Sequence, residues 1–174
     1  MLNKQQRLDM IMDSMLYQMS LQSINSKTIS MAVTLVCNYL EIKKPKIILS
    51  TETKTGCYIP ELKEFHIARS FCNYETVKDF ERVMEIIAHE LRHKYQYDTG
   101  MFSLDDPYLT PDEHGYEAYK NQPIEKDAFE FGESMREDLA TVILDMFEEE
   151  YVSKTDRRRA EERATTRRER PRRR

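Results

Sequence analysis

A chain of 174 residues, of which 40% are hydrophobic and 33% charged, can bury one core of ordinary size and still carry a charged surface. Four glycines and six prolines argue against a many-stranded β fold, and three widely spaced cysteines exclude a disulfide-stapled secreted scaffold. The net charge of −4 is unevenly divided, because the segment from Thr155 onward holds ten arginines and four acidic residues, a net +6, and residues 1–154 therefore carry −10.

The N-terminal region is predicted to form two packing helices within residues 1–42. The first covers about residues 3–20, where apolar side chains recur at steps of three and four. The second begins near Ser26 or Thr28 and ends before Pro45, because proline disfavours helix in the residue that precedes it. The predicted buried face of this second helix is Ile29, Val33, Val36, Tyr39 and Leu40. The chain shows no apolar stretch of the signal-peptide or membrane-spanning type, so we expect a cytoplasmic location without a membrane partner.

Short strands are predicted between residues 45 and 70. Residues 46–50 (KIILS) are apolar and bounded by turn residues. Residues 56–60 and 65–68 alternate like the two arms of a hairpin whose turn lies near residues 61–63. Three short strands cannot form a core alone. The prediction is therefore an α+β fold, mostly helical, in which helices cover one face of a small three-stranded sheet.

A third helix is predicted over residues 76–99. Thr76 and Asp79 have the spacing of a helix-capping pair, and Gly100 is a typical stop after the last turn. The predicted buried face is Phe80, Val83, Met84, Ile87 and Leu91.

The C-terminal part is predicted to combine a loop, a long helix and a tail. Residues 101–122 are polar and contain two prolines and one glycine, so they are predicted to form a loop, and loops of that length are usually functional. The helix covers about residues 123–151, with a core face of Ile124, Ala128, Phe131, Met135, Leu139, Val142 and Met146. Residues 1–153 are thus expected to form a single domain, and residues 154–174 a disordered arginine-rich tail.

The segment HELRH, residues 89–93, is the most informative motif. Two histidines four residues apart lie on one helical face, where both imidazoles can bind a single metal ion. Glu90 lies about 100° around the helix from His89, close enough to take a proton from a metal-bound water without binding the metal. The alternative is two surface histidines on a charged helix that holds no metal.

A catalytic zinc ion needs a third protein ligand and one open position. The metzincin extension HExxHxxGxxH is absent, because Gln96 and Thr99 stand where that pattern has Gly and His. A carboxylate from the last helix remains, and its motif favours Glu125 over Asp127. An acidic residue in a first helical turn can also serve only to interact with the helix dipole.

A resemblance to a known family is carried by HELRH together with the later pattern E-x-x-A-x-x-F, formed by Glu125, Ala128 and Phe131. This combination resembles gluzincin-type metallopeptidases. It is most similar to the ImmA/IrrE-type family of phage, mobile-element and stress-response proteins. The resemblance covers about residues 45–140.

The resemblance implies a minimal zincin-like fold with a zinc ion as cofactor and a substrate strand along the sheet edge. The implied zinc ligands are His89, His93 and Glu125. Glu90 is implied to be the catalytic carboxylate. The chain departs from the family pattern at Phe129, where relatives have the Asn or Asp that orients a ligand imidazole, so this role would fall to Asp127 or to a backbone carbonyl.

His114 and Tyr119, in the segment between His93 and Glu125, are candidates for a hydrogen bond to the oxyanion of the tetrahedral intermediate. The alternative is that they only pack the junction between two helices.

The leading functional hypothesis is a zinc-dependent peptidase that cuts a specific intracellular regulatory protein. One alternative is a zinc-stabilised regulatory or binding module without turnover. Retention of Glu90 favours the peptidase, because a structural zinc site needs ligands and no unligated carboxylate. The other alternative is a protein that contacts nucleic acid or another polyanion through residues 157–174.

Overall fold

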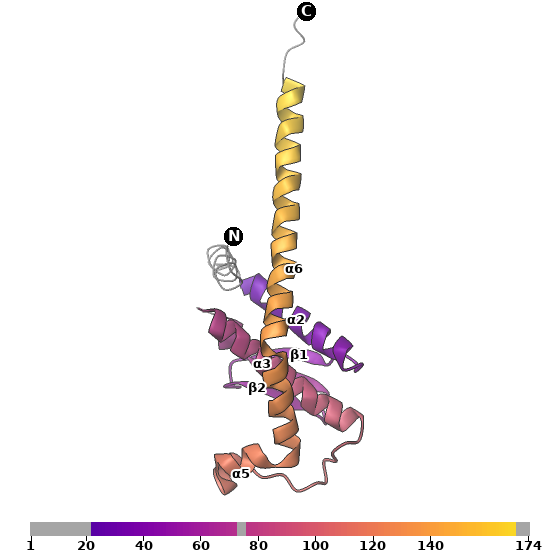
Figure 1. Ribbon diagram of the computed structural model, residues 1–174, viewed down its shortest axis with the longest axis vertical. Helices are drawn as coiled ribbons and strands as arrows, with labels where there is room; N and C mark the ends of the chain where they lie inside the picture. Colours follow the sequence, from indigo (N-terminus) through magenta and orange to yellow (C-terminus); the bar gives the residue numbers. More distant parts are fainter. Residues whose placement is uncertain (1–21, 73–75, 170–174) are drawn as a thin grey trace, which may run out of the picture.

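The computed structural model describes residues 22–72 and 76–169. The predicted helix over residues 3–20 lies outside these described residues. Helices surround a small sheet, and the last helix passes along the whole length of the molecule (Figure 1). The elements follow in the order α2 (Gln22–Tyr39), β1 (Lys46–Ser50), β2 (Gly56–Ile59), β3 (Glu64–Ala68), the 3-10 helix η1 (Arg69–Cys72), α3 (Val77–Asp98), α4 (Pro111–His114), α5 (Tyr116–Asn121) and α6 (Pro123–Glu169). The predicted α+β class is confirmed.

The three strands form one mixed sheet in the order β1-β3-β2. β1 is parallel to β3, and β2 is antiparallel to β3, with Tyr58 opposite Phe65. Phe65 and Ile67 are fully buried, so one face of the central strand enters the core. The predicted strand 46–50 and the predicted hairpin are confirmed, and β2 forms the edge of the sheet that lies on α3.

Helix α3 begins where the sequence predicted. The Oγ1 of Thr76 accepts a hydrogen bond from the backbone N–H of Asp79 at 3.1 Å. The Asp79 carboxylate accepts one from the Thr76 N–H at 3.0 Å, which completes a capping box. Gly100 follows the helix with φ +70°, a left-handed conformation that suits glycine. All five apolar residues of the predicted face of α3 are buried.

Helix α2 is shorter at its C-terminal end than predicted. It ends at Tyr39, and Glu41 adopts φ +55° in the turn that leads to β1. Four of the five residues predicted to be buried on its face are buried, whereas Tyr39 is 67% exposed. The Tyr39 ring lies beside Phe131 at 6.1 Å between centroids, at the margin of the helix packing. The prediction for Tyr39 was therefore wrong.

The face that α6 buries changes along its length. Ile124, Ala128 and Leu139 are buried as predicted, but Val142 and Met146 are 45% and 42% exposed. The positions buried in their place are Ala140, Ile143 and Leu144. Helix α6 packs against α3 and also against α2, where Lys27 lies over the ring of Phe147. Because α2 and α3 pack on different sides of α6, α6 needs two apolar faces. The prediction had placed all buried residues of α6 on one face.

Two predictions about the C-terminal region are corrected. Residues 101–122 contain the short helices α4 and α5, although they were predicted to be a loop. Residues 154–169, predicted to be disordered, continue α6 as helix beyond the predicted end at residue 151. Alanine, arginine and glutamate are good helix formers, and no glycine or proline occurs between Gly132 and Pro171. Within the described residues no helix is both long and apolar enough to cross a membrane.

Candidate metal centre

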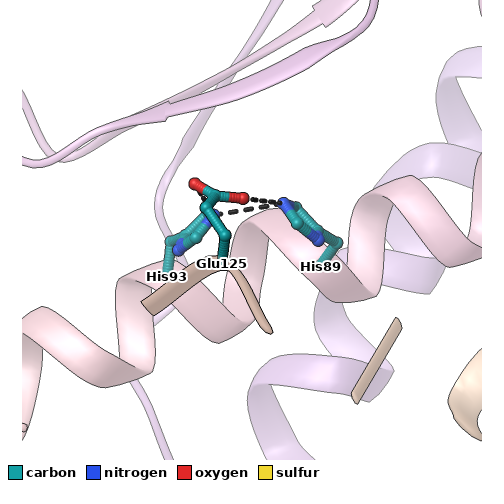
Figure 2. A group of neighbouring side chains, drawn as sticks. All are labelled: His89, His93 and Glu125. Carbon is teal, nitrogen blue, oxygen red and sulfur yellow. Dashed lines mark hydrogen bonds and ion pairs between the residues drawn. The ribbon is translucent and has the colours of Figure 1, made fainter. Parts of the chain in front are cut away.

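Three side chains from two helices meet in one cluster (Figure 2). His89 and His93 lie one turn apart on α3, and Glu125 comes from the first turn of α6. The Nε2 atoms of the two histidines are 3.1 Å apart. Glu125 Oε2 lies 3.4 Å from His89 Nε2, and Glu125 Oε1 lies 3.2 Å from His93 Nε2. The structure thus brings together the three residues that the sequence predicted as metal ligands.

The spacing of these donor atoms fits a tetrahedral metal site. Bonds of 2.0–2.2 Å at tetrahedral angles place neighbouring ligand atoms about 3.3–3.6 Å apart. The two imidazole Nε2 atoms are 3.1 Å apart, and the Glu125 carboxylate lies 3.4 Å from His89 Nε2 through Oε2 and 3.2 Å from His93 Nε2 through Oε1, which is close to that range. Glu125 Oε2 is also a buried oxygen without a hydrogen-bond partner among the described residues, which is the environment of an atom free to bind a cation. The residues present therefore fit a metal ion.

The electrostatics of the cluster favour a cation. Glu125 is only 1% exposed, and burial alone disfavours its charged form. The close polar contacts of its carboxylate with His89 and His93 nevertheless hold the pKa of Glu125 well below its usual range. Burial also opposes protonation of His93, but its hydrogen bond with Glu125 and the charge of Glu90 raise its pKa above 6.5. A buried carboxylate that stays charged between two imidazoles attracts a positive ion.

A tyrosine that the sequence did not indicate holds the third ligand. The hydroxyl of Tyr108 donates a hydrogen bond to Glu125 Oε1 at 2.6 Å. Burial, and then the bond to Glu125, raise the pKa of Tyr108, so this hydroxyl keeps its proton. The neighbouring backbone is clamped by Gln122, whose side chain accepts from Leu109 N–H and donates to Leu109 C=O. Because Oε1 accepts the Tyr108 bond, Oε2 is left as the oxygen for a metal.

Gln96 holds the second histidine. Its side-chain N–H groups donate to the Ile124 carbonyl at 2.9 Å and to Asp127 Oδ2 at 2.7 Å, which fixes the orientation of the amide. Its oxygen lies 2.9 Å from His93 Nδ1. Since an amide oxygen only accepts, Nδ1 carries a proton, which makes Nε2 the nitrogen through which the neutral ring would bind a metal. The sequence analysis treated Gln96 only as the residue that replaces a metzincin glycine.

Replacing Gln96 by methionine is expected to weaken metal binding about 10- to 100-fold, because His93 loses the acceptor that fixes its tautomer. Titration of the metal-free protein, followed by calorimetry, measures the change. Thr28→Val is the matched control, since it removes a fully buried polar group on α2, a helix that carries no residue of the cluster. An equal loss of affinity in both variants would show that Gln96 acts only through general packing.

His89 has no acceptor of the kind that Gln96 provides for His93. His89 Nδ1 is buried and has no hydrogen-bond partner among the described residues. The ring of Phe129 lies against the His89 ring at 4.5 Å between centroids. Asp127, two residues earlier, accepts both hydrogen bonds of the Arg92 guanidinium and one from Gln96. Among the described residues, packing against Phe129 takes the place of a hydrogen bond at His89 Nδ1.

Glu90 lies next to the cluster but bonds to edge strand β2 and not to the three cluster residues. Its Oε2 accepts a hydrogen bond from the backbone N–H of Tyr58 in edge strand β2 at 2.8 Å. β2 can approach α3 this closely because residue 56 is glycine: a Cβ there would lie 2.7 Å from Ile86 Cγ2 and 3.0 Å from Glu90 Cγ. Glu90 and His89 both line an open cleft of about 780 Å³. Glu90 therefore faces solvent beside the metal cluster without being part of it.

The two candidate oxyanion donors have different positions. Tyr119 on α5 lines the same cleft as Glu90, and its ring packs edge-on against Phe129. Burial and the charge of Glu125 raise the pKa of Tyr119, so its hydroxyl can donate. His114 on α4 is exposed, lies 4.0 Å from the Glu113 carboxylate, and does not line the cleft. The structure brings Tyr119 to the site and leaves His114 outside it.

A close contact between the two ligand-bearing helices is made at Gly132. A Cβ at this position would lie 2.9 Å from the backbone oxygen of Glu85 and 3.2 Å from His89 Cβ. Ala128, one turn earlier, is fully buried. Small residues at both positions allow α6 to approach α3 closely enough to place Glu125 beside the histidines.

Comparison of the chain with protein-family models, with curated proteins and with solved structures found no match.

Proposed function

We propose that this protein is a zinc-dependent peptidase of minimal zincin-like fold that hydrolyses a peptide bond in a specific intracellular regulatory protein. One observation carries the proposal. The Nε2 atoms of His89 and His93 and the carboxylate of Glu125 lie within 3.4 Å of one another, and another carboxylate, Glu90, stands beside them in an open cleft. A purely structural site needs no such carboxylate.

The donor set supports zinc as the metal. Two imidazoles and one carboxylate, with a fourth position left to water or substrate, form the ligand set of catalytic zinc sites. Calcium and magnesium prefer sites built from oxygen atoms alone. Metal analysis of the purified protein should therefore find about one zinc ion per chain.

The reaction adds one water molecule across the peptide C–N bond. A bound zinc ion supplies Lewis-acid polarisation of the carbonyl and lowers the pKa of water. Glu90 accepts the proton that the attacking water loses and transfers it to the amide nitrogen as the C–N bond breaks, which yields a carboxylate and an amine. The Tyr58 N–H holds Glu90 Oε2, so Oε1 is the oxygen left for the proton. The Tyr119 hydroxyl is the donor for the carbonyl oxygen as its charge develops.

Replacing Glu90 by glutamine should leave zinc content unchanged and lower cleavage about 10²- to 10⁴-fold, because the variant keeps every metal ligand and loses the proton acceptor. Zinc is measured by elemental mass spectrometry, and cleavage by the new N-termini that appear in cells expressing the parent or the variant. Glu61→Gln, in the exposed turn between β2 and β3, is the matched control.

Two results would contradict the proposal. Equal cleavage by the parent and by Glu90→Gln would show that Glu90 has no part in the chemistry. A parent that binds one zinc ion and produces no new N-terminus would indicate a metal-stabilised binding module without turnover.

A further inference from the structure

The cleft beside Glu90 continues along α3, away from the metal cluster. Its inner end contains His89 and Glu90, and an aromatic wall formed by Tyr116, Tyr119 and Phe129 follows. Its far end, towards the N-terminus of α3, is lined by three cationic side chains, those of Lys78, Arg82 and Arg136. Nothing in the proposed chemistry uses this far end.

The cationic end is neutralised only in part by its neighbours. Arg136 forms ion pairs with Glu85 at 3.6 Å and with Glu137 at 3.8 Å, and Glu81 also lines this part of the cleft. Lys78 and Arg82 are exposed and have no ion-pair partner among the described residues. Arg136 Nε is buried without a hydrogen-bond partner in the same part of the structure. Lys78 and Arg82 thus remain as two cations without an ion-pair partner in the described part of a chain whose residues 1–154 carry a net −10.

Helix geometry fixes how far this end lies from the reacting bond. Arg82 precedes His89 by seven residues and Lys78 precedes it by eleven, so at 1.5 Å per residue they lie about 10 and 16 Å from it along α3. An extended peptide advances about 3.3 Å per residue. A substrate that follows the cleft from the metal cluster would thus place its third to fifth residue among the three cations.

We propose that the far end of the cleft binds an acidic side chain of the substrate, three to five residues from the cleaved bond. This inference rests on the proposed peptidase function and adds the substrate class. An aspartate or glutamate there would pair with Lys78 and Arg82.

The test is cleavage of a random peptide library by the zinc-loaded full chain, with the products sequenced by mass spectrometry. Aspartate and glutamate should be enriched about two- to fivefold at three to five residues on one side of the cut, the range expected for partly exposed ion pairs. The double variant Lys78→Glu/Arg82→Glu should lose this enrichment and favour lysine and arginine instead. The control variant Lys43→Glu/Lys63→Glu, which makes the same change of net charge at two exposed positions outside the cleft, should keep it.

The outcomes separate the two proposals. Cleavage without acidic enrichment, or with the same enrichment in Lys78→Glu/Arg82→Glu as in the parent, overturns the substrate class and leaves the peptidase assignment intact. A loss of enrichment in Lys43→Glu/Lys63→Glu as large as in Lys78→Glu/Arg82→Glu would show a general charge effect and also overturn it. Absence of any cleavage by fully zinc-loaded protein overturns the peptidase assignment, and the substrate class with it.

Discussion

The variant Glu125→Gln is expected to lose metal binding almost completely, with an affinity at least about 100-fold below that of the parent. The substitution keeps the size of the side chain and removes the one charged ligand of the cluster. Its effect should exceed the 10- to 100-fold losses typical of residues that only orient a ligand. Competition with a chromophoric chelator measures affinities over that range.

The control for this experiment is Glu130→Gln, which makes the same chemical change on the exposed face of the same helix. It should bind metal like the parent. Glu125→Gln should still fold, because the amide oxygen can accept the Tyr108 bond. If Glu125→Gln binds zinc as tightly as Glu130→Gln does, the third ligand is another residue and the cluster is not the metal site.

The variant Gly132→Val is expected to destabilise the protein by about 3 kcal/mol and to weaken metal binding about tenfold. Its first added carbon would lie 2.9 Å from the Glu85 backbone oxygen and 3.2 Å from His89 Cβ. The two helices must separate to relieve this overlap, and that separation moves Glu125 away from the histidines. Urea denaturation of the metal-free protein and metal titration measure the two effects separately.

Ser134→Val is the control for Gly132→Val, because it places the same β-branched side chain at an exposed position two residues further along α6. Its effect should be limited to helix propensity, a few tenths of a kcal/mol. Metal affinity unchanged in a destabilised Gly132→Val would show that the position of Glu125 does not depend on this contact.

The sequence predicted well those features that depend on local pattern. The capping pair Thr76 and Asp79, the apolar stripe of α3 and the alternation in the hairpin are each set by residues close in sequence, and each was confirmed. The histidine pair of HELRH is also local, because helical geometry alone places both rings on one face. Helical geometry could not predict that Glu125 lies beside these rings, because 32 residues separate Glu125 from His93. That prediction depended on the E-x-x-A-x-x-F motif.

Features that arise from packing between distant segments were not predicted. Tyr108 reaches Glu125 from a segment with no periodicity, and no pattern marks it among the ten tyrosines of the chain. The change of buried face in α6 depends on α2 packing on a side different from α3, which one helical stripe cannot reveal. Gln96 had a detectable signal: it lies three residues after His93, on the same face of the helix, and a buried amide there needs partners.

Helix α6 carries Glu125 of the candidate metal site at one end and an arginine-rich segment at the other. It is continuous from Pro123 to Glu169, and it extends well beyond the other elements (Figure 1). At 1.5 Å per residue, Glu125 and residue 169 are separated by roughly 65 Å, about twice the diameter of a small domain. In this conformation the helical part of the arginine-rich segment cannot reach the cleft of its own chain. A polyanion bound at residues 157–169 and a peptide bound at the cleft would therefore not compete with each other. Both could bind one molecule at the same time, and the length of α6 would set the distance between them.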